Sequence, residues 1–248
     1  MQIDLTDQVA IVTGSAHRVG KAIALELARR GVHIIVHYHS ADDTTVRNTI
    51  HEIKSYGVDA VPVQADISTP QGVQTLFSVL EAHFDRLHIL VNSASSFTGN
   101  RLLDITPEDW NRSIAVNMTA PLLCIQAAVP FMRRNDPPGG GIVNICDYGS
   151  IRPWVERADH GISKAGLWML TQVSAASLGE ENIRVNAVLP GPVLKPPHGS
   201  DAHWQSLAQR SPLKRTGDAS DVARAVAYLL SEDYITGTLL EVNGGEAL

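Results

Sequence analysis

Three side chains that can exchange protons lie close together in the second half of the sequence. His160 and Lys164 are four residues apart, which is about one turn of a helix, and Asp147 precedes His160. Near neutral pH, only the imidazolium form of a histidine is a useful acid. Lys164 should lower the pKa of His160 by repulsion between like charges, whereas a facing Asp147 carboxylate should raise it. The spacing therefore predicts an acid–base centre in which Asp147 and His160 could rebuild a proton donor.

A glycine-bearing turn near the start of the chain predicts an anion-binding site. Residues 13–20 read TGSAHRVG and stand between a strand-like run at 9–12 and a helix predicted over 19–30. In such a turn, backbone N–H groups at the helix N-terminus can face a pyrophosphate. A tight turn without a ligand is the alternative, and the place of this turn in the first strand–helix unit favours the ligand.

Short apolar runs alternate with longer amphipathic stretches along the whole chain. The strand-like runs cover residues 9–12, 32–38, 60–64, 88–91, 141–146, 183–188 and 238–242. Helices are predicted over 19–30, 45–56, 70–84, from Thr106 onward, 162–178 and 218–230. This alternation implies an α/β fold, a Rossmann-type doubly wound parallel sheet of about seven strands with helices on both faces.

We expect one domain over residues 1–248, because no linker or repeat divides the chain. Ligands bind to such sheets along the carboxyl ends of the strands. The segment 190–213 follows the sixth strand, is long and carries several prolines, so we predict that it is a substrate lid loop. His198 and His203 in that segment have no third partner at metal spacing, and we expect no metal site.

Composition limits the class of protein. The 248 residues are 44% hydrophobic and 19% charged, as in a soluble globular domain that can bury a full core. The net charge of -6 argues against a nucleic-acid partner. No apolar run approaches the roughly 18 residues of a membrane span, and no secretory signal opens the chain. We therefore predict a cytoplasmic protein with neither a nucleic-acid nor a membrane partner.

The motifs together resemble those of the short-chain dehydrogenase/reductase family. The first turn is similar to the Thr-Gly-x-x-x-Gly-x-Gly of that family. Further matches follow in order along the chain: Ala65-Asp66-Ile67, Asn92-Ser93-Ala94-Ser95, Asn117, Ser163-Lys164-Ala165, Ile183-Arg184-Val185-Asn186 and Pro190-Gly191. The resemblance covers nearly the whole chain. It implies a nicotinamide-dependent oxidoreductase that acts on a small molecule and forms a homodimer or homotetramer.

Departures from the common family pattern resemble the pteridine reductases. Arg18 replaces the middle glycine of the turn, Phe97 follows the Asn-Ser-Ala motif, and Asp147 stands where most members carry a serine. By resemblance, Arg18 contacts cofactor phosphates and borders the substrate, Phe97 stacks over a pterin, and Asp147 supports proton delivery. The alternatives are a surface arginine, a core phenylalanine and a solvated carboxylate.

The sequence favours NADP(H) as the cofactor. Folds that bind NAD carry an acid at the end of the second strand, whereas residues 36–40 here read VHYHS. Asp42 and Asp43 follow closely, but acids there suit the start of the next helix. The cofactor-binding residues that the turn and the resemblance imply are Gly14, Ser15, His17, Arg18, Val19, Gly20, Tyr38, His39, Ser40, Asp66, Ile67, Asn92, Ala94, Lys164, Pro190, Gly191 and Val193.

His160 occupies the position of the family's catalytic tyrosine. By resemblance, Lys164 holds the nicotinamide ribose and Asn117 holds a water that relays protons. Three readings remain open. His160 could be the acid, polarised by Asp147; Asp147 or the water on Asn117 could deliver the proton while His160 shapes the pocket; or the site could have lost useful turnover.

The preferred function is NADPH-dependent reduction of a small planar substrate, with a pterin-like C=N group or an activated carbonyl. Trp154 and Trp204 are further candidates for contact with that substrate. The alternative is a weakly active or non-catalytic NADP-binding protein that serves as a sensor or scaffold, because a fold does not by itself settle function.

Overall fold

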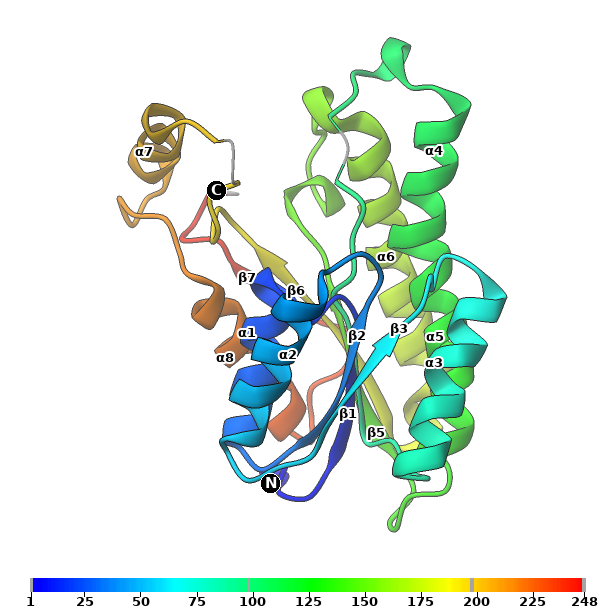
Figure 1. Ribbon diagram of the computed structural model, residues 1–248. Coiled ribbons are helices and arrows are strands. Elements are labelled where there is room, and N and C mark those ends of the chain that lie inside the picture. The colour runs from blue at the N-terminus through cyan, green and yellow to red at the C-terminus, as the bar shows by residue number, and fades with distance from the viewer. Residues whose placement is uncertain (1, 98, 197–198, 247–248) are drawn as a thin grey trace.

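Parallel strands form the centre of this computed structural model, which describes residues 2–97, 99–196 and 199–246. Within those residues one sheet has the order β3-β2-β1-β4-β5-β6-β7 (Figure 1). The strands are β1 (Val9–Val12), β2 (His33–Tyr38), β3 (Ala60–Gln64), β4 (Ile89–Asn92), β5 (Gly140–Ile145), β6 (Ile183–Pro190) and β7 (Leu239–Val242). The predicted doubly wound Rossmann-type sheet is confirmed. Its strand order reverses between β1 and β4, which is where such sheets open a crevice for ligands.

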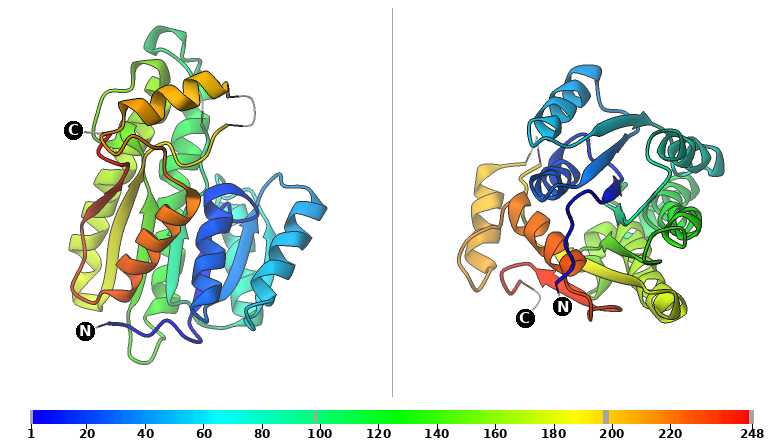
Figure 2. Two further views of the ribbon diagram at one scale, coloured as in Figure 1. Left: turned by 90° about the vertical axis from the view of Figure 1, so that its left-hand side faces the viewer. Right: turned by 90° about the horizontal axis from the view of Figure 1, so that it is seen from below.

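Helices cover both faces of the sheet (Figures 1 and 2). One layer holds α1 (Arg18–Arg29), α2 (Asp43–Lys54) and α8 (Ala219–Ser231), and the other holds α3 (Pro70–His83), α4 (Pro107–Ile114), α5 (Ala120–Met132) and α6 (Ala158–Leu178). Alternate residues of β1 serve the two layers. Ala10 and Val12 belong to the core cluster under α1 and α8, and Val9 and Ile11 to the cluster under α3 and α5. Burial of both faces explains the continuous apolar strands.

The predicted helix that starts after Thr106 is confirmed, with an added feature. The Thr106 hydroxyl accepts the backbone N–H of Asp109 at 3.1 Å, as an N-cap should. Between α4 and α5 the helix passes through a π-helical turn, Ala115–Thr119, which contains Asn117. Such turns are frequent at functional sites because they shift a side chain relative to the regular helix.

One helical stretch corrects an expectation from composition. Residues Pro107–Met132 are long and apolar enough to span a membrane by length and hydropathy, although no such stretch was predicted. Less than half of the tested window, 44%, is buried. The fully buried residues Cys124, Ala128 and Met132 pack in the core beneath the sheet. The core helices of soluble proteins also meet this test of length and hydropathy.

Two predicted boundaries are wrong. The segment 190–213 is not a loop throughout, because it contains α7 (Asp201–Arg210), whose first turn is capped by the Ser200 hydroxyl accepting His203 N–H at 3.1 Å. Its residues 197–198, and with them His198, lie outside the described residues. Helix α6 begins at Ala158 rather than at Ile162. His160 is therefore fixed in the first turn of a helix.

Candidate active site

The turn between β1 and α1 is closely packed. Gly14 has φ +67°, and a Cβ atom on it would lie 3.0 Å from the Cα of Ala94. A Cβ atom on Gly20 would lie 2.3 Å from the carbonyl oxygen of Gly14. Only glycine fits at either position, because one needs a left-handed backbone and the other needs direct contact between turn and helix.

Helix α1 begins without a side-chain cap. His17 stands at the N-cap but forms no capping hydrogen bond, and the first turn holds no acid. The N–H groups of Arg18, Val19 and Gly20 have no acceptor within the helix, because the first three helical residues precede any i−4 carbonyl. Arg18 is exposed and has φ +56°. These donors fit the pyrophosphate of a dinucleotide.

Other predicted cofactor residues turn their side chains into the fold. The Ser15 hydroxyl donates to the carbonyl oxygen of Val12 at 2.7 Å, and the Asn92 amide donates to Asn144 Oδ1 at 2.8 Å. Ile67 is also buried. These residues can offer a ligand only backbone groups, and their side chains hold the edge of the sheet in place.

The ends of β2 and β3 carry the accessible candidates. Tyr38 is half-buried, and His39, Ser40 and Asp66 are exposed. Asp66 Oδ1 accepts the hydroxyl and the backbone N–H of Ser68 at 2.6 and 3.0 Å. The Ser68 hydroxyl bond lowers the pKa of Asp66, so this carboxylate is ionised at neutral pH.

The last predicted cofactor segment follows β6. Pro190 ends the strand, and Gly191 N–H donates to the carbonyl oxygen of Val242 at 3.0 Å. A Cβ atom on Gly191 would lie 2.8 Å from the Cα of Asn243, and Val193 is buried. This segment is therefore held against the C-terminal strand.

His160 and Asp147 face each other at the same edge of the sheet. His160 Nε2 contacts Asp147 Oδ2, and its Nδ1 lies 2.8 Å from the carbonyl oxygen of Ser96. The His160 side chain is 1% exposed and that of Asp147 is 19% exposed. Asp147 caps a 3-10 helix, Tyr148–Ser150, in which its Oδ1 accepts Gly149 N–H at 2.9 Å. This cap fixes the carboxylate.

Asn117 fastens the loop that follows β4. Its Nδ2 donates to the Ser96 carbonyl oxygen and to Ser163 Oγ, both at 2.9 Å. Its Oδ1 accepts the Ser96 N–H at 2.8 Å and the Ser95 hydroxyl at 3.0 Å. Both Nδ2 hydrogens are then used, so none is left for His160 Nδ1 at 3.3 Å. His160 Nδ1 is free to donate its own hydrogen to the Ser96 carbonyl oxygen.

The two ring nitrogens of His160 therefore meet acceptor oxygens. Nδ1–H donates to a carbonyl, and Nε2 lies against a carboxylate. With Nδ1–H donated to the Ser96 carbonyl oxygen, the contact between Nε2 and Asp147 Oδ2 is a hydrogen bond when a further proton lies between these two atoms. The pair is then either an imidazolium with a carboxylate or a neutral imidazole with a carboxylic acid, and both forms hold a transferable proton.

Lys164 lies in the next turn of α6 with its side chain buried. Its ammonium donates to the carbonyl oxygen of Ile145 at 2.7 Å. The described residues give Nζ this one acceptor, so two of its three N–H donors remain for a ligand. Burial lowers the pKa of Lys164, and the Asp147 carboxylate opposes that shift. A buried ammonium with unused donors fits the ribose hydroxyls of a nicotinamide nucleotide.

Aromatic rings form a wall beside this pair. Phe97 is 55% exposed, and its ring stands edge to face against His160 with centroids 4.8 Å apart. Trp154 lies 5.9 Å from Phe97 and 6.0 Å from Tyr148. The Arg157 guanidinium carbon lies 3.9 Å from the centre of the Phe97 ring. The wall joins two predicted substrate residues, Phe97 and Trp154, to Tyr148 and Arg157, which were not predicted to contact the substrate.

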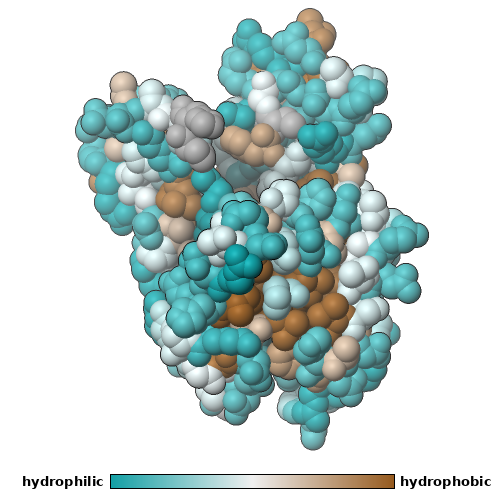
Figure 3. All heavy atoms as spheres, in the orientation of Figure 1, coloured by the Kyte–Doolittle hydropathy of each residue, from teal (hydrophilic) through white to brown (hydrophobic). Residues whose placement is uncertain are grey.

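Two predicted substrate residues do not join the wall. Trp204 is half-buried on α7, and Arg18 lies at the start of α1. Among the described residues, no ring or cation–ring contact links either to Phe97 or Trp154. The surface in Figure 3 is hollowed between the side that carries α7 and the upper ends of α4 and α6.

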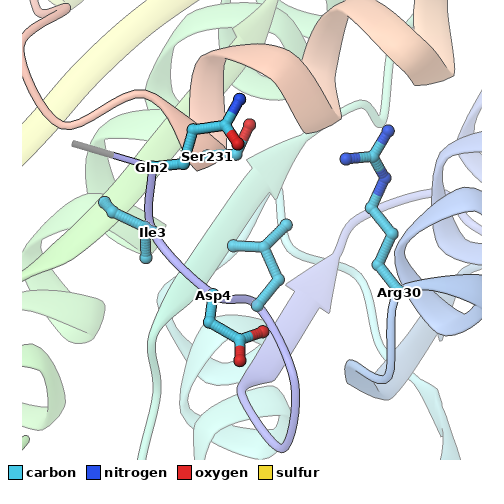
Figure 4. A pocket seen from close by; sticks show the side chains of 6 residues that line it. Gln2, Ile3, Asp4, Arg30 and Ser231 are labelled. Atoms are coloured by element: carbon cyan, nitrogen blue, oxygen red, sulfur yellow. The ribbon is translucent and has the colours of Figure 1, made fainter.

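A separate pocket of about 400 Å³ lies at the amino ends of the strands (Figure 4). Its lining residues are Gln2, Ile3, Asp4, Leu5, Arg30 and Ser231. It brings together no acid–base pair and lies at the edge of the sheet opposite the turn of Gly14. We assign it no role. Within the described residues, no group of three metal-ligating side chains is present.

Comparison with known proteins identifies the family. A family model described as enoyl-(acyl carrier protein) reductase matches residues 14–246. Glucose 1-dehydrogenase 2 of Bacillus subtilis is 35% identical, with 100% of this chain and 98% of that protein covered. 3-Oxoacyl-[acyl-carrier-protein] reductase of Staphylococcus epidermidis is 32% identical, with 95% and 97% covered. The chain belongs to the short-chain dehydrogenase/reductase family.

A solved structure of this family extends the likeness to three dimensions. L-sorbose reductase of Gluconobacter frateurii, complexed with NADPH and L-sorbose, has 27% sequence identity and a TM-score of 0.92. The alignment covers 100% of this chain and 99% of that one. The family consists of nicotinamide-dependent oxidoreductases, so the predicted enzyme class is confirmed. Ser95, Ser96 and His37 carry contacts that sequence reasoning did not assign, because their partners are backbone groups or an amide from a distant helix.

Proposed function

We propose that this oxidoreductase uses NADPH to reduce a small planar substrate, with a pterin-like C=N group or an activated carbonyl. The observation that most supports this function is the contact between His160 and Asp147 beside the exposed ring of Phe97. It combines a proton source with a flat apolar surface. The similar proteins include L-sorbose reductase and 3-oxoacyl-[acyl-carrier-protein] reductase, and this supports the carbonyl form of the substrate.

Cofactor selection rests on charge at the end of β2. No carboxylate ends that strand, and the nearby Asp42 is engaged as the cap of α2, where its Oδ1 accepts Thr45 N–H at 2.9 Å. The exposed residues His39 and Ser40 can donate to a 2′-phosphate. Arg18 adds a cation at the start of α1. When bound, NADPH supplies the hydride, and Lys164 holds its ribose.

We assign proton delivery to Asp147, with His160 behind it. The Asp147 side chain reaches the open side of the pair, since it is 19% exposed and His160 only 1%. As hydride reaches the substrate carbon, the Asp147 carboxyl gives its proton to the substrate nitrogen or oxygen. The pair is left as a carboxylate and a neutral imidazole. Lys164 offsets the new negative charge, and solvent returns the proton along the exposed edge of Asp147.

This assignment gives Asn117 a positioning role. Its amide groups are occupied by Ser95, Ser96 and Ser163. It therefore holds the carbonyl oxygen of Ser96 against His160 Nδ1. That contact keeps the His160 ring oriented toward Asp147, and the proton remains at the end of the pair that the substrate can reach.

The substrate would be held on the aromatic wall. Phe97 and Trp154 offer apolar faces and edges to a flat substrate ring. The Arg157 guanidinium beside Phe97 would repel a positively charged substrate ring, so neutral or anionic rings are favoured. Trp204 on α7 would approach from the other side of the hollow. The segment 190–213 keeps its proposed role as a lid, although α7 makes it a helical one.

We further propose that the protein is a cytoplasmic homodimer or homotetramer. The outer face of α6 supports the oligomer, because Ile162, Met169 and Val173 are 45, 58 and 54% exposed. These residues recur at helical spacing and form an apolar stripe. Light scattering on the native protein and on Met169→Glu would test it, and a native monomer would overturn it.

The experiment that tests the function has two steps. Thermal unfolding is measured with and without NADPH, and NADPH oxidation is then followed with a panel of dihydropterins, quinones and ketones. We expect stabilisation by NADPH and oxidation with planar members of the panel. Stabilisation without oxidation by any member would favour a sensor or scaffold. Absence of stabilisation would overturn NADPH binding itself.

A further inference from the structure

His37 is a buried imidazole that the proposed proton transfer does not use. It lies near the end of β2, and its side chain is 1% exposed. Its Nδ1 accepts the N–H of Gly14 at 3.1 Å, and its Nε2–H donates to the carbonyl oxygen of Ala65 at 3.0 Å. Its own carbonyl oxygen accepts the N–H of Ser15 at 2.9 Å. The residue thus joins the turn after β1 to the ends of β2 and β3.

These contacts fix the protonation state of the ring. A donor faces Nδ1 and an acceptor faces Nε2, so the ring is neutral with its hydrogen on Nε2. An imidazolium would place an N–H against the N–H of Gly14. Burial lowers the pKa of His37 to about 4, and the nearby His39 and Asp66 act on it in opposite directions. The ring is therefore a permanent acceptor for Gly14 at neutral pH.

Gly14 is held from two sides. The ring of His37 binds its N–H, and Ala94 lies so close that a Cβ atom on Gly14 would be 3.0 Å from its Cα. The carbonyl oxygen of Gly14 in turn lies against Gly20 in the first turn of α1. The position of Gly14 therefore sets where the uncapped end of α1 lies relative to the crevice between β1 and β4.

We propose that His37 is a cofactor-positioning residue, which sets the turn 13–17 so that the N–H groups of Arg18, Val19 and Gly20 meet the dinucleotide phosphates. This inference rests on the proposed binding of NADPH. His37 does not touch the cofactor in this assignment. It acts through Gly14, and its effect should appear in NADPH affinity rather than in proton transfer.

Two substitutions separate the two contacts of the ring. In His37→Asn, the side-chain oxygen takes the place of Nδ1 and can still accept the Gly14 N–H. In His37→Gln, the amide reaches the place of Nε2 and can still donate to Ala65, but Gly14 loses its acceptor. We expect the NADPH dissociation constant of His37→Asn to stay within about threefold of the native value. For His37→Gln we expect it to rise about tenfold, as for one lost hydrogen bond.

His33 provides a matched control at the other end of β2. Its Nδ1 accepts the N–H of Asp59 at 2.9 Å, so His33→Gln removes the same kind of contact away from the turn. NADPH fluorescence titration and thermal unfolding are measured for all three variants. We expect His33→Gln to change the unfolding temperature and not the NADPH affinity.

The outcomes distinguish the inference from the function on which it rests. If native protein fails to bind NADPH, the proposed function fails and this inference fails with it. If native protein binds and His37→Gln binds equally well, the function stands and the positioning role is overturned. Equal loss of affinity in His37→Asn and His37→Gln would also overturn it, since the contact with Gly14 would then not be the cause.

Discussion

His37 and His160 are equally buried, yet they meet opposite partners. Each side chain is 1% exposed. His37 lies between a donor, Gly14 N–H, and an acceptor, the carbonyl oxygen of Ala65. His160 lies between two acceptors, the carbonyl oxygen of Ser96 and the carboxylate of Asp147. The contacts of His37 are satisfied by a ring with one N–H. The contacts of His160 are satisfied when a second proton is shared between Nε2 and the Asp147 carboxylate.

The difference teaches that partner chemistry, and not burial alone, decides what a buried histidine can do. Burial opposes the charged form of His37. Around His37, burial outweighs the opposing effects of the Ala65 carbonyl contact and of Asp66, so the ring stays neutral and bridges Gly14 to Ala65. Around His160 a carboxylate shares the second proton, so the pair can store it. The turn held by His37 thus fixes the backbone groups that would bind the cofactor, and the pair of His160 and Asp147 is the proton source.

The substitution Asp147→Asn gives the largest expected effect, because it removes the shared proton that distinguishes His160 from His37. An amide oxygen can still accept Gly149 N–H and preserve the cap, but the shared proton is lost. We expect the turnover rate to fall about 10²–10⁴-fold, which is the usual contribution of a positioned acid. The NADPH dissociation constant should change little. Steady-state kinetics and NADPH titration measure the two quantities.

Asp218→Asn is the matched control for that substitution. Asp218 also caps a helix, because it begins α8 with a capping box. Its Oδ1 accepts Ser220 N–H at 2.8 Å. We expect turnover close to native in this variant. Native turnover in Asp147→Asn would show that another group delivers the proton.

Acid unfolding tests the His37 side of the comparison. Its pKa of about 4 lies below the ordinary value of 6.5, so the folded protein binds fewer protons than the unfolded chain between these values. The stabilisation is complete above about pH 6.5 and is lost as the pH falls toward 4. At about 1.4 kcal/mol per pKa unit, native protein should lose about 3 kcal/mol more than His37→Asn between pH 7 and pH 4.

The comparison between native protein and His37→Asn is necessary because many carboxylates also titrate in this range. Their contributions are common to both proteins and cancel in the difference. The free energy of unfolding is measured by urea denaturation at each pH. Parallel pH dependence in the two proteins would mean that His37 is not held neutral by its surroundings.

The substitution His160→Tyr restores the family's catalytic residue and tests whether a tyrosine can donate the proton at this position. A phenol is larger than an imidazole, and the side chain would enter a fully packed position between Asp147 and Phe97. We expect a loss of about 1–3 kcal/mol in the free energy of unfolding from overpacking. Phe97 is exposed and can swing outward, so simple ketones should gain access to a phenolic proton donor. Ketone reduction that stays absent would indicate that Asp147 also blocks the family mechanism.

The parts of the fold that sequence predicted are those fixed by local signals. The strands were found from apolar runs, and the start of α4 from Thr106 and the proline after it. Helix α7 was missed because the prolines that precede it dominate the composition of the segment. Asp147 caps a 3-10 helix directly after β5, and the sequence does not predict that helix. Its capping partners lie within three residues, but nothing in their types required that turn.

Part of the candidate site was predictable as a set of residues, but its contacts were not. Asp147, His160 and Asn117 were correctly brought together by spacing and resemblance. The acceptor that decides the state of His160 is the backbone oxygen of Ser96, and a backbone oxygen has no signature in sequence. The same holds for Gly14 and Ala65 around His37. Tertiary structure chooses which backbone groups meet a buried ring.

Arg18→Gly is the smallest expected effect, and it separates stability from binding on the cofactor side. Arg18 has φ +56°, a conformation that costs a residue with a side chain about 1–2 kcal/mol. Glycine removes that strain but adds about 0.5–1 kcal/mol of chain entropy to the unfolded state. The net gain in the free energy of unfolding should be about 0–1.5 kcal/mol. Loss of the cation should meanwhile weaken NADPH binding severalfold.

The control for Arg18→Gly is the same substitution in an ordinary helical turn. Arg47 is exposed in the interior of α2, so Arg47→Gly should lower the free energy of unfolding by about 1 kcal/mol and leave NADPH affinity unchanged. Urea denaturation and NADPH titration give both quantities for both variants. A gain in stability together with a loss of affinity at position 18 would mean that the strained arginine is kept for its charge. A loss of stability would mean that the Arg18 side chain supports the turn. The conformation of the turn would then depend on Arg18 as well as on His37, Gly14 and Gly20.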